Sequence, residues 1–300
     1  MLRYCYSNIL SLVWFSIIVL GDSKIDEVCH SSLLQSETDL GGTKYKWSIT
    51  TKQRCNIKRV TYDELSAIHP YGLPPLYHEP LIIYSNNYSE RLSSGCIIET
   101  FMQKTSLENI TKNFPPDFRV TLSSSNSFSD HRRTVTLTQY INETVSTEVM
   151  PRHLSNETWY LFGETYSEEW QKMLNDYCYP PCKTCTKELS ALSFGIGGRG
   201  SGVQWHTHGP GFSQTLNGRK HWILYKPKDK PTYNSDYTSR FWMEEVYTSL
   251  PESKKPYECT LHPGEMIYFP NNWHHAIINL DSYTSFVSTF TTEHNVEAFQ

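Results

Sequence analysis

The stretch from residue 192 to 291 is divided into short apolar segments, and this division constrains the fold more than any other feature. Gly, Pro and Asn separate eight such segments: 192–196, 203–208, 212–216, 221–225, 259–261, 265–269, 275–279 and 286–291. Only 240–249 has a helical pattern. Strands this short and numerous bury their apolar faces in a closed barrel or in two stacked sheets. We therefore expect a mainly β protein, a double-sheet jelly-roll barrel.

The residues before 192 are expected to add flanking helices and strands to this barrel. Helix-start residues at Thr61–Glu64 precede an apolar strand at Leu81–Tyr84. Further strands are expected at 118–122 and 134–140, around a Ser-rich loop at 123–129, and a helix at 168–176. The predicted organisation is a signal peptide at 1–23, a poorly packed lead-in at 24–54, an N-terminal elaboration at 55–191, the barrel core at 192–293 and a tail at 294–300.

Charge and hydropathy exclude several classes of protein. Lys and Arg number 27 against 31 Asp and Glu, the net charge is −4, and no long basic run occurs, so nucleic acid is not an expected partner. A mean hydropathy of −0.51 argues against a polytopic membrane protein. An aromatic content of 14% argues against a disordered chain.

The N-terminus has the pattern of a secretory signal peptide. Arg3 precedes the apolar run Ile9–Leu20, which is too short to span a bilayer and ends at small or polar residues. We expect cleavage after Gly21 or Ser23 and no membrane span thereafter, the alternative being an uncleaved signal anchor. The predicted location is the endoplasmic reticulum lumen or the exterior. The final residues contain no KDEL-type signal, so retention and secretion both stay open.

Sequons and cysteines agree with this compartment. Four Asn-X-Ser/Thr acceptor sites are predicted to be glycosylated: Asn87, Asn109, Asn142 and Asn156. Eight cysteines become seven once Cys5 leaves with the signal peptide, and oxidising conditions favour disulfides among them. The group Cys178, Cys182 and Cys185 could form a zinc knuckle or a redox pair. It lacks a suitably spaced fourth ligand and a βαβ context, so a structural disulfide in a Pro-rich turn is preferred.

Histidines gather in the barrel segment. His206 and His208 are two residues apart, and a strand has a side-chain period of two, so both imidazoles point to one face and can converge on one metal ion. A Pro-Gly turn, an apolar strand and a second turn then lead to His275. In a rolled sheet this distant histidine can complete a three-ligand site.

The same region resembles the JmjC-domain branch of the Fe(II)- and 2-oxoglutarate-dependent oxygenases, whose domain is a cupin-type double-stranded β-helix. The resemblance is strong over 192–292 and extends over roughly 50–293. It rests on the Gly-rich Gly197–Gly202, on His206, on Gly218–Tyr225 and on the Pro-Gly-Glu to Trp-His-His run that ends at His275. Weaker matches upstream are 55–59, 79–80 and 159–163.

The resemblance implies Fe(II) and 2-oxoglutarate as cofactors. His206 and His275 match the two metal-binding histidines of the family, and Lys220 matches the lysine that meets the distal carboxylate of 2-oxoglutarate. His208 occupies the carboxylate position, which raises the charge of the centre. Val203 and Phe212 stand at positions that are often polar in the family. Trp205, Trp222, Tyr225 and Trp273 could line the pocket or serve as core.

Two hypotheses about function follow. The first is a lumenal dioxygenase that hydroxylates a protein substrate at a degenerate metal site. The second is a catalytically inactive barrel that serves as an interaction or scaffold module for a lumenal protein partner. The persistence of His206, His275 and Lys220 favours the first hypothesis, and His208, Val203 and Phe212 favour the second. Substrate, metal identity and oligomeric state are not predicted.

Overall fold

The computed structural model describes residues 47–291, apart from 75–76, 93, 146–152 and 164. The predicted signal peptide, Cys29, most of the predicted lead-in and the tail lie outside the described residues. None of the helices in the described ranges is long and apolar enough to cross a membrane. The described residues all belong to one compact unit, which begins at Tyr45.

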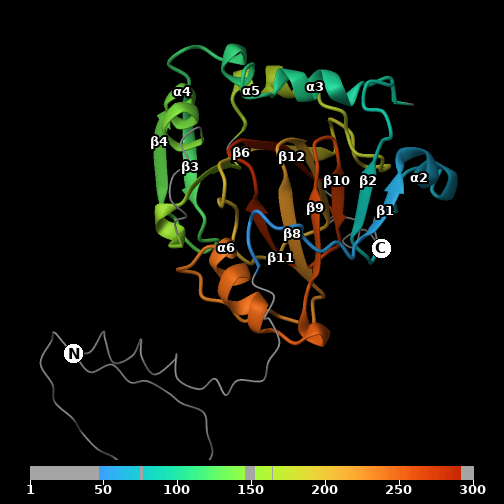
Figure 1. The fold of residues 1–300 in the computed structure, drawn as a ribbon. Coiled ribbons are helices and arrows are strands. Elements are labelled where there is room, and N and C mark those ends of the chain that lie inside the picture. The colour runs from blue at the N-terminus through green and yellow to red at the C-terminus, as the bar shows by residue number, and fades with distance from the viewer. Residues whose placement is uncertain (1–46, 75–76, 93, 146–152, 164, 292–300) are drawn as a thin grey trace, which may run out of the picture. The chain divides into compact units, whose positions relative to one another are not determined.

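A nine-stranded sheet forms the larger layer. Its strands are β1 (Lys58–Thr61), β2 (Leu81–Tyr84), β3 (Arg119–Ser124), β4 (Arg132–Thr136), β5 (Trp159–Phe162), β6 (Ser190–Gly197), β7 (Gly211–Asn217), β10 (Met266–Phe269) and β12 (Thr284–Thr291). Their order is β1-β2-β10-β7-β12-β6-β5-β3-β4. Only β1 and β2 run parallel; every other neighbouring pair is antiparallel. The upstream segments therefore extend both edges of the barrel sheet rather than forming a layer of their own (Figure 1).

The second layer is a three-stranded antiparallel sheet in the order β11-β8-β9. Its strands are β8 (Lys220–Tyr225), β9 (Tyr257–Leu261) and β11 (His274–Asn279). Apolar side chains of both sheets share one core, which includes Trp222, Leu224, Ile267, Phe269 and Ile277. Burial of these faces between two antiparallel sheets gives the jelly-roll arrangement that the short strands predict.

The helices are short and lie around the sheets. They are α2 (Tyr62–Ile68), α3 (Ile98–Lys104), α4 (Leu137–Tyr140), α5 (Glu168–Leu174) and α6 (Ser239–Phe241). Short 3₁₀ or π turns are η1 (Ile110–Asn113), η2 (Ile141–Val145), η3 (Ser155–Glu157), η4 (Trp242–Val246), η5 (Tyr247–Ser249) and η6 (Glu252–Lys254). Figure 1 shows α3 and α5 together at one end of the barrel and α6 at the other. Thr61 starts α2 with a capping box that includes Glu64, as the sequence predicts.

Seven of the eight expected barrel strands are present, and 203–208 is the exception. Within it, His206 forms one isolated bridge to His275, while the Gln204 amide donates to Ser125 instead of to a neighbouring strand. This competing bond interrupts the ladder. The strand expected at 134–140 is also wrong in its second half. The Thr136 hydroxyl accepts from the Gln139 amide and begins α4 there.

The end of the predicted lead-in is well packed. Trp47 and Ile49 are 1% and 7% exposed, and they join an apolar cluster with Trp205, Trp242 and Ile278. The sequence shows no apolar periodicity there, because the burial of one isolated tryptophan does not require a repeating pattern. The expectation of loose packing therefore differs from the structure over 47–49.

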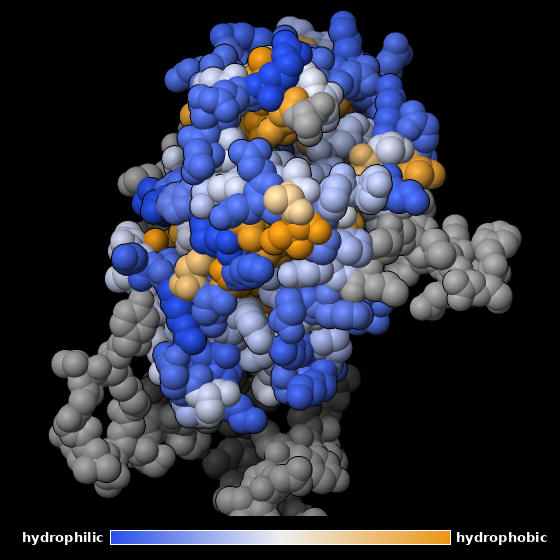
Figure 2. Space-filling model, turned by 90° about the vertical axis from the view of Figure 1, so that its right-hand side faces the viewer, coloured by the Kyte–Doolittle hydropathy of each residue, from blue (hydrophilic) through white to orange (hydrophobic). Residues whose placement is uncertain are grey.

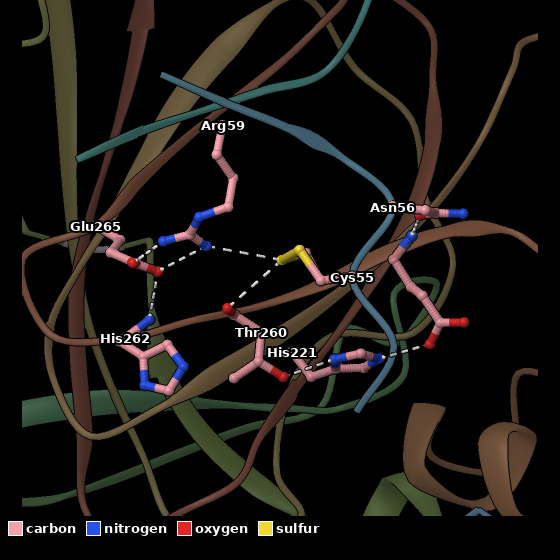
Figure 3. The surroundings of a disulfide bond; sticks show 9 residues. Cys55, Asn56, Arg59, His221, Thr260, His262 and Glu265 are labelled. Atoms are coloured by element: carbon pink, nitrogen blue, oxygen red, sulfur yellow. Dashed lines mark hydrogen bonds and ion pairs between the residues drawn. A yellow bond between two sulfur atoms is a disulfide. The ribbon is translucent and has the colours of Figure 1, made fainter. Parts of the chain in front are cut away.

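Three disulfides connect the described cysteines, and Cys29 lies outside the described residues. The pairs are Cys55–Cys259, Cys96–Cys178 and Cys182–Cys185. The first joins the chain before β1 to β9 (Figure 3). The expectation of a disulfide in the Pro-rich turn is confirmed by the bond between Cys182 and Cys185, whereas Cys178 pairs with the distant Cys96.

Polar groups surround the Cys55–Cys259 bond (Figure 3). Arg59 forms a two-pronged ion pair with Glu265, and it also approaches the sulfur of Cys259 at 3.9 Å. On β8, the buried ring of His221 lies 3.2 Å from the carboxylate of buried Glu258 and 3.0 Å from the hydroxyl of Thr260. Both partners belong to β9. Strands β8 and β9 are thus joined by side chains as well as by their ladder.

Candidate metal centre

Three imidazoles meet at one mouth of the barrel. His206 and His208 lie in the connection between β6 and β7, and His275 is the second residue of β11. The backbone amides of His206 and His275 each donate to the other residue's carbonyl oxygen at 3.0 Å, so their side chains leave the same face. One ring nitrogen from each of the three histidines lies within 4.8 Å of the others. The predicted convergence is therefore present, although 203–208 is not a regular strand.

Hydrogen bonds fix the tautomer of each imidazole. In all three rings Nδ1 lies close to a backbone carbonyl oxygen, which can only accept. The distances are 2.8 Å from His206 to Gln204, 2.8 Å from His208 to Gly209 and 2.9 Å from His275 to Trp273. Each Nδ1 must therefore carry the proton, and each Nε2 keeps its lone pair. This carbonyl-oriented arrangement is the usual support of metal-binding histidines.

Electrostatics favour the neutral, ligating form of the His206 and His275 rings. Burial, together with the neighbouring His208, lowers the pKa of His206 to about 4. Burial and the adjacent His206 hold the pKa of His275 well below its ordinary value. His275 also lies between two flat side chains, with ring centroids 5.6 Å from Trp222 and 5.1 Å from Phe269. The pocket therefore keeps these lone pairs unprotonated at neutral pH.

The donor set fits a transition metal. Three neutral nitrogens from two chain segments are a known ligand set for Zn²⁺, and imidazole also suits iron and copper. Within the described part of the chain, no Asp or Glu belongs to the cluster. The resemblance predicts a carboxylate at position 208. The His208 ring lies between the other two imidazoles and two apolar rings, with centroids 5.2 Å from Phe269 and 5.1 Å from Phe290.

The space beside the imidazoles is small. A cavity of about 20 Å³ is bounded by the three histidines and by side chains of both sheets, which are Tyr160, Phe162, Val203, Trp222, Phe269, Ile277, Phe286, Ser288 and Phe290. A single water molecule occupies about this volume. An extended dicarboxylate such as 2-oxoglutarate does not fit in the described arrangement.

Lys220 is enclosed next to this cavity. Its side chain is fully buried, its ammonium nitrogen donates to the Tyr160 hydroxyl at 2.7 Å, and it lies 3.2 Å from the centroid of the Phe286 ring. Desolvation lowers the pKa of Lys220 well below the ordinary value. No carboxylate of the described residues forms an ion pair with it. Phe286 therefore covers the Lys220 amine, which the resemblance predicts to receive the distal carboxylate of 2-oxoglutarate.

Gly195 makes this aromatic cover possible. A Cβ atom at Gly195 would lie 2.1 Å from the Phe286 ring, so only glycine leaves room for that ring. Tyr160 continues the stack, with a centroid 5.8 Å from Phe286 and planes 12° apart. Residues 286, 288 and 290 on β12 face the cavity at the period of a strand, which is a signal that the sequence carried. Tyr160 lies in 159–163, which the resemblance matched only weakly, and no sequence signal placed it at the site.

Of the other residues that the sequence indicated for the site, two line the cavity and the rest pack elsewhere. Val203 and Trp222 line the cavity. Phe212 instead packs against Tyr268 on the opposite face of the large sheet, because successive side chains of β7 alternate. Trp205 and Tyr225 belong to the cluster next to η4, and Trp273 packs on Tyr257. Phe212 therefore does not block the cavity.

The predicted glycosylation sites are all on the surface. Asn87, Asn142 and Asn156 are exposed, whereas Asn109 is partly buried. The amide nitrogen of Asn109 donates to the Gln103 carbonyl at 2.9 Å, and its oxygen accepts from Lys112 at 2.8 Å. Glycosylation of these positions remains a prediction, with Asn109 the least available of the four.

Two sheets that enclose a histidine cluster at one mouth define a cupin-type barrel protein. Residues 93–295 match the family model for a cupin-like domain. The chain belongs to the cupin-like JmjC-domain family, as the motifs predict.

Named relatives support the same assignment. The chain is 33% identical over 246 residues to JmjC domain-containing protein 8 of Mus musculus, covering 81% of this chain and 84% of that protein. For the Homo sapiens protein of the same name the identity is also 33%, covering 86% of it. A shorter match joins 28% of this chain to 21% of the 2-oxoglutarate and iron-dependent oxygenase JMJD4 of Mus musculus, at 29% identity. The family is thus related to 2-oxoglutarate and iron oxygenases.

Proposed function

We propose that this protein is a metal-binding JmjC barrel of the secretory pathway that acts as a binding module for a protein partner. The observation that carries the proposal is the set of three imidazoles whose Nδ1 atoms are all engaged by carbonyl oxygens. Their Nε2 atoms are left to bind one ion. Fe(II) is the ion named with relatives of this family, and Zn(II) also suits three nitrogens.

The space around the histidine cluster does not favour catalysis. A 2-oxoglutarate oxygenase needs an open site for the co-substrate and a cation for its distal carboxylate. Here the cavity measures about 20 Å³, and the Phe286 ring lies between it and Lys220. Within the barrel a bound ion would link β11 to the β6–β7 connection, since its ligands come from both.

A second candidate is a 2-oxoglutarate-dependent hydroxylase that acts on a protein substrate. The observation in its favour is Lys220, which lies at the family position directly behind the cavity wall. Turnover would require the Phe286 ring to leave that position. A bound ion would then supply redox chemistry for oxygen activation.

The compartment is also part of the proposal. Three disulfides within the described residues support an oxidising location, and the signal-peptide pattern supports entry into the secretory pathway.

One experiment separates the two candidates. Protein purified from a secretory host is analysed for metal content, and 2-oxoglutarate decarboxylation is then measured with and without added Fe(II). The binding module should hold one ion per chain and show no Fe(II)-dependent turnover. Lys220→Met should leave metal content unchanged. Turnover in the parent that Lys220→Met removes would overturn the binding-module proposal in favour of the hydroxylase.

A further inference from the structure

The disulfide between Cys182 and Cys185 differs from the other two in the length of chain that it closes. Its cysteines are three residues apart, against 82 for Cys96–Cys178 and 204 for Cys55–Cys259. A cross-link stabilises mainly by removing chain entropy from the unfolded state, and this effect grows with loop length. The short bond therefore contributes least to stability.

The loop that carries this disulfide is firmly positioned. Leu73 forms a parallel bridge with Cys182, and its amide donates to the Pro181 carbonyl at 2.8 Å. Gly72 has φ +83°, and a Cβ atom there would lie 2.6 Å from the Cys182 Cα. Only glycine permits this approach of the two backbones. The two cysteines are therefore fixed against the segment that follows α2.

The two cysteines are unequally exposed. Cys182 is partly exposed, whereas Cys185 is 5% exposed. Cys182 is therefore the more accessible of the two cysteines to an incoming thiolate. In thiol–disulfide exchange the attacked sulfur forms the mixed disulfide and the other sulfur leaves as a thiolate. The structure thus distinguishes an attacked cysteine from a leaving cysteine.

A large groove opens beside this loop. Its volume is about 870 Å³, and it is formed by α2, the loop 85–96 and the loop 177–185. Its lining residues include Cys182 and Cys185 but none of the three histidines. Figure 2 shows the side of the molecule that carries α2, where hydrophilic side chains surround smaller apolar areas.

The groove suits an extended peptide segment. Asn86, Ser94 and Arg91 offer polar groups to a peptide backbone, and Tyr71, 86% exposed, offers an apolar face at the rim. Lys183 and Thr184 lie between the two cysteines, and the Thr184 hydroxyl is 3.7 Å from the Cys182 sulfur. A hydroxyl donor beside the Cys182 sulfur would stabilise its thiolate.

We propose that Cys182–Cys185 is a dithiol–disulfide exchange site for a cysteine-containing polypeptide held in this groove. A client thiolate attacks the Cys182 sulfur, the Cys182–Cys185 bond breaks, and Cys185 leaves as a thiolate that takes up a proton. The second client thiolate then attacks the client sulfur of the mixed disulfide, and Cys182 leaves. The client dithiol is oxidised to a disulfide, and Cys182 and Cys185 are reduced to two thiols, so two electrons and two protons are balanced.

The test uses the full chain from a secretory host after removal of N-glycans, because Asn87 also lines the groove. The probe is a Gly/Ser/Asn-rich peptide with two reduced cysteines, mixed with the oxidised protein. After an acid quench and alkylation, mass spectrometry identifies the reduced cysteines. We expect one peptide disulfide per chain, and we expect Cys182 and Cys185 to be the only cysteines whose alkylation rises above that of the protein without peptide. No peptide oxidation, or equal reduction of all three disulfides, would overturn the proposal.

Single-cysteine variants test the direction of attack. The remaining cysteine of each variant is a thiol, so these variants are mixed with the disulfide form of the peptide. In Cys185→Ser the Cys182 thiolate should attack the peptide disulfide and form a mixed disulfide, and the second peptide sulfur leaves as a thiol. Cys182→Ser should trap at least about tenfold less peptide. Equal trapping by the two variants would contradict the assigned roles. For the groove, Tyr71→Ser in the Cys185→Ser background should slow trapping. Tyr166→Ser is the matched control, because Tyr166 is 72% exposed and is not a lining residue. Equal rates for the two tyrosine variants would remove the groove from the proposal.

Discussion

His206 and His275 form a reciprocal pair of backbone hydrogen bonds, each amide donating to the other's carbonyl oxygen at 3.0 Å. The same pairing places their imidazole centroids 4.2 Å apart. The bridge joins the β6–β7 connection to β11 of the smaller sheet. Assembly of the metal centre and closure of this barrel mouth are therefore a single structural event.

Removing a ligand should abolish stoichiometric metal binding. His275→Ala deletes one of three converging nitrogens, and we expect affinity to fall by more than about tenfold. His274→Ala is the matched control, because the adjacent imidazole points elsewhere and lies 3.3 Å from the Pro227 carbonyl. Metal content by mass spectrometry and titration calorimetry measure both variants. Full occupancy in His275→Ala would place the third ligand elsewhere.

The metal-free protein should lose stability in mild acid. The pKa of His206 falls from 6.5 to about 4 on folding, so between these values the unfolded chain binds more protons than the folded chain. The free energy of unfolding therefore rises with pH across this window and is lost as pH falls through it. Urea denaturation at several pH values measures the slope. Glutamine does not titrate, so His206→Gln should reduce the slope of the free energy of unfolding against pH. An unchanged slope would show that His206 is not its source.

Replacing the third imidazole by a carboxylate should have opposite effects with and without metal. His208→Asp supplies the carboxylate that the resemblance predicts at this position, and it should tighten Fe(II) binding. Without metal, the new carboxylate faces the rings of Phe269 and Phe290, so the melting temperature should fall, at a cost of about 1–3 kcal/mol. Calorimetry and thermal melts test both effects. Weaker Fe(II) binding than the parent would show that His208 is not a ligand.

Shortening Phe286 should open the route to Lys220. Phe286→Ala removes the ring 3.2 Å from the ammonium nitrogen, and it should cost about 3–5 kcal/mol of stability while creating measurable 2-oxoglutarate affinity. Phe290→Ala is the control: it also lines the cavity but does not contact Lys220 in the structure described. Calorimetric titration compares the two. If neither variant binds 2-oxoglutarate, Phe286 is not the side chain that closes the site.

Loss of the longest-range disulfide should destabilise the barrel. Cys55→Ser with Cys259→Ser releases a cross-link of sequence separation 204, and we expect a loss of about 2–5 kcal/mol. The double variant Cys182→Ser with Cys185→Ser is the comparison, because its cross-link spans only three residues and should matter far less. Denaturant unfolding ranks them, and the reverse order would refute the entropy argument.

Local pattern determined much of this protein. The punctuated apolar segments specified seven barrel strands, and the Thr61–Glu64 box specified the start of α2, because both signals lie within a few residues of the structure they form. The spacing of His206 and His208, followed by the turn to His275, indicated the histidine cluster. The residue types required by a metal site were therefore readable from the chain alone.

The tertiary structure decided everything that depends on contacts between distant segments. Residues 203–208 have an apolar strand pattern. The hydrogen bonds of Gln204 to Ser125 and of His206 to His275 nevertheless leave this segment irregular. Phe286 covers Lys220 only because β12 lies beside β6, where Gly195 leaves space for the ring. The choice of Cys96 as the partner of Cys178 likewise follows from packing. Sequence spacing encodes local geometry, whereas the shape of a cavity is set by side chains that only the packed sheets bring together.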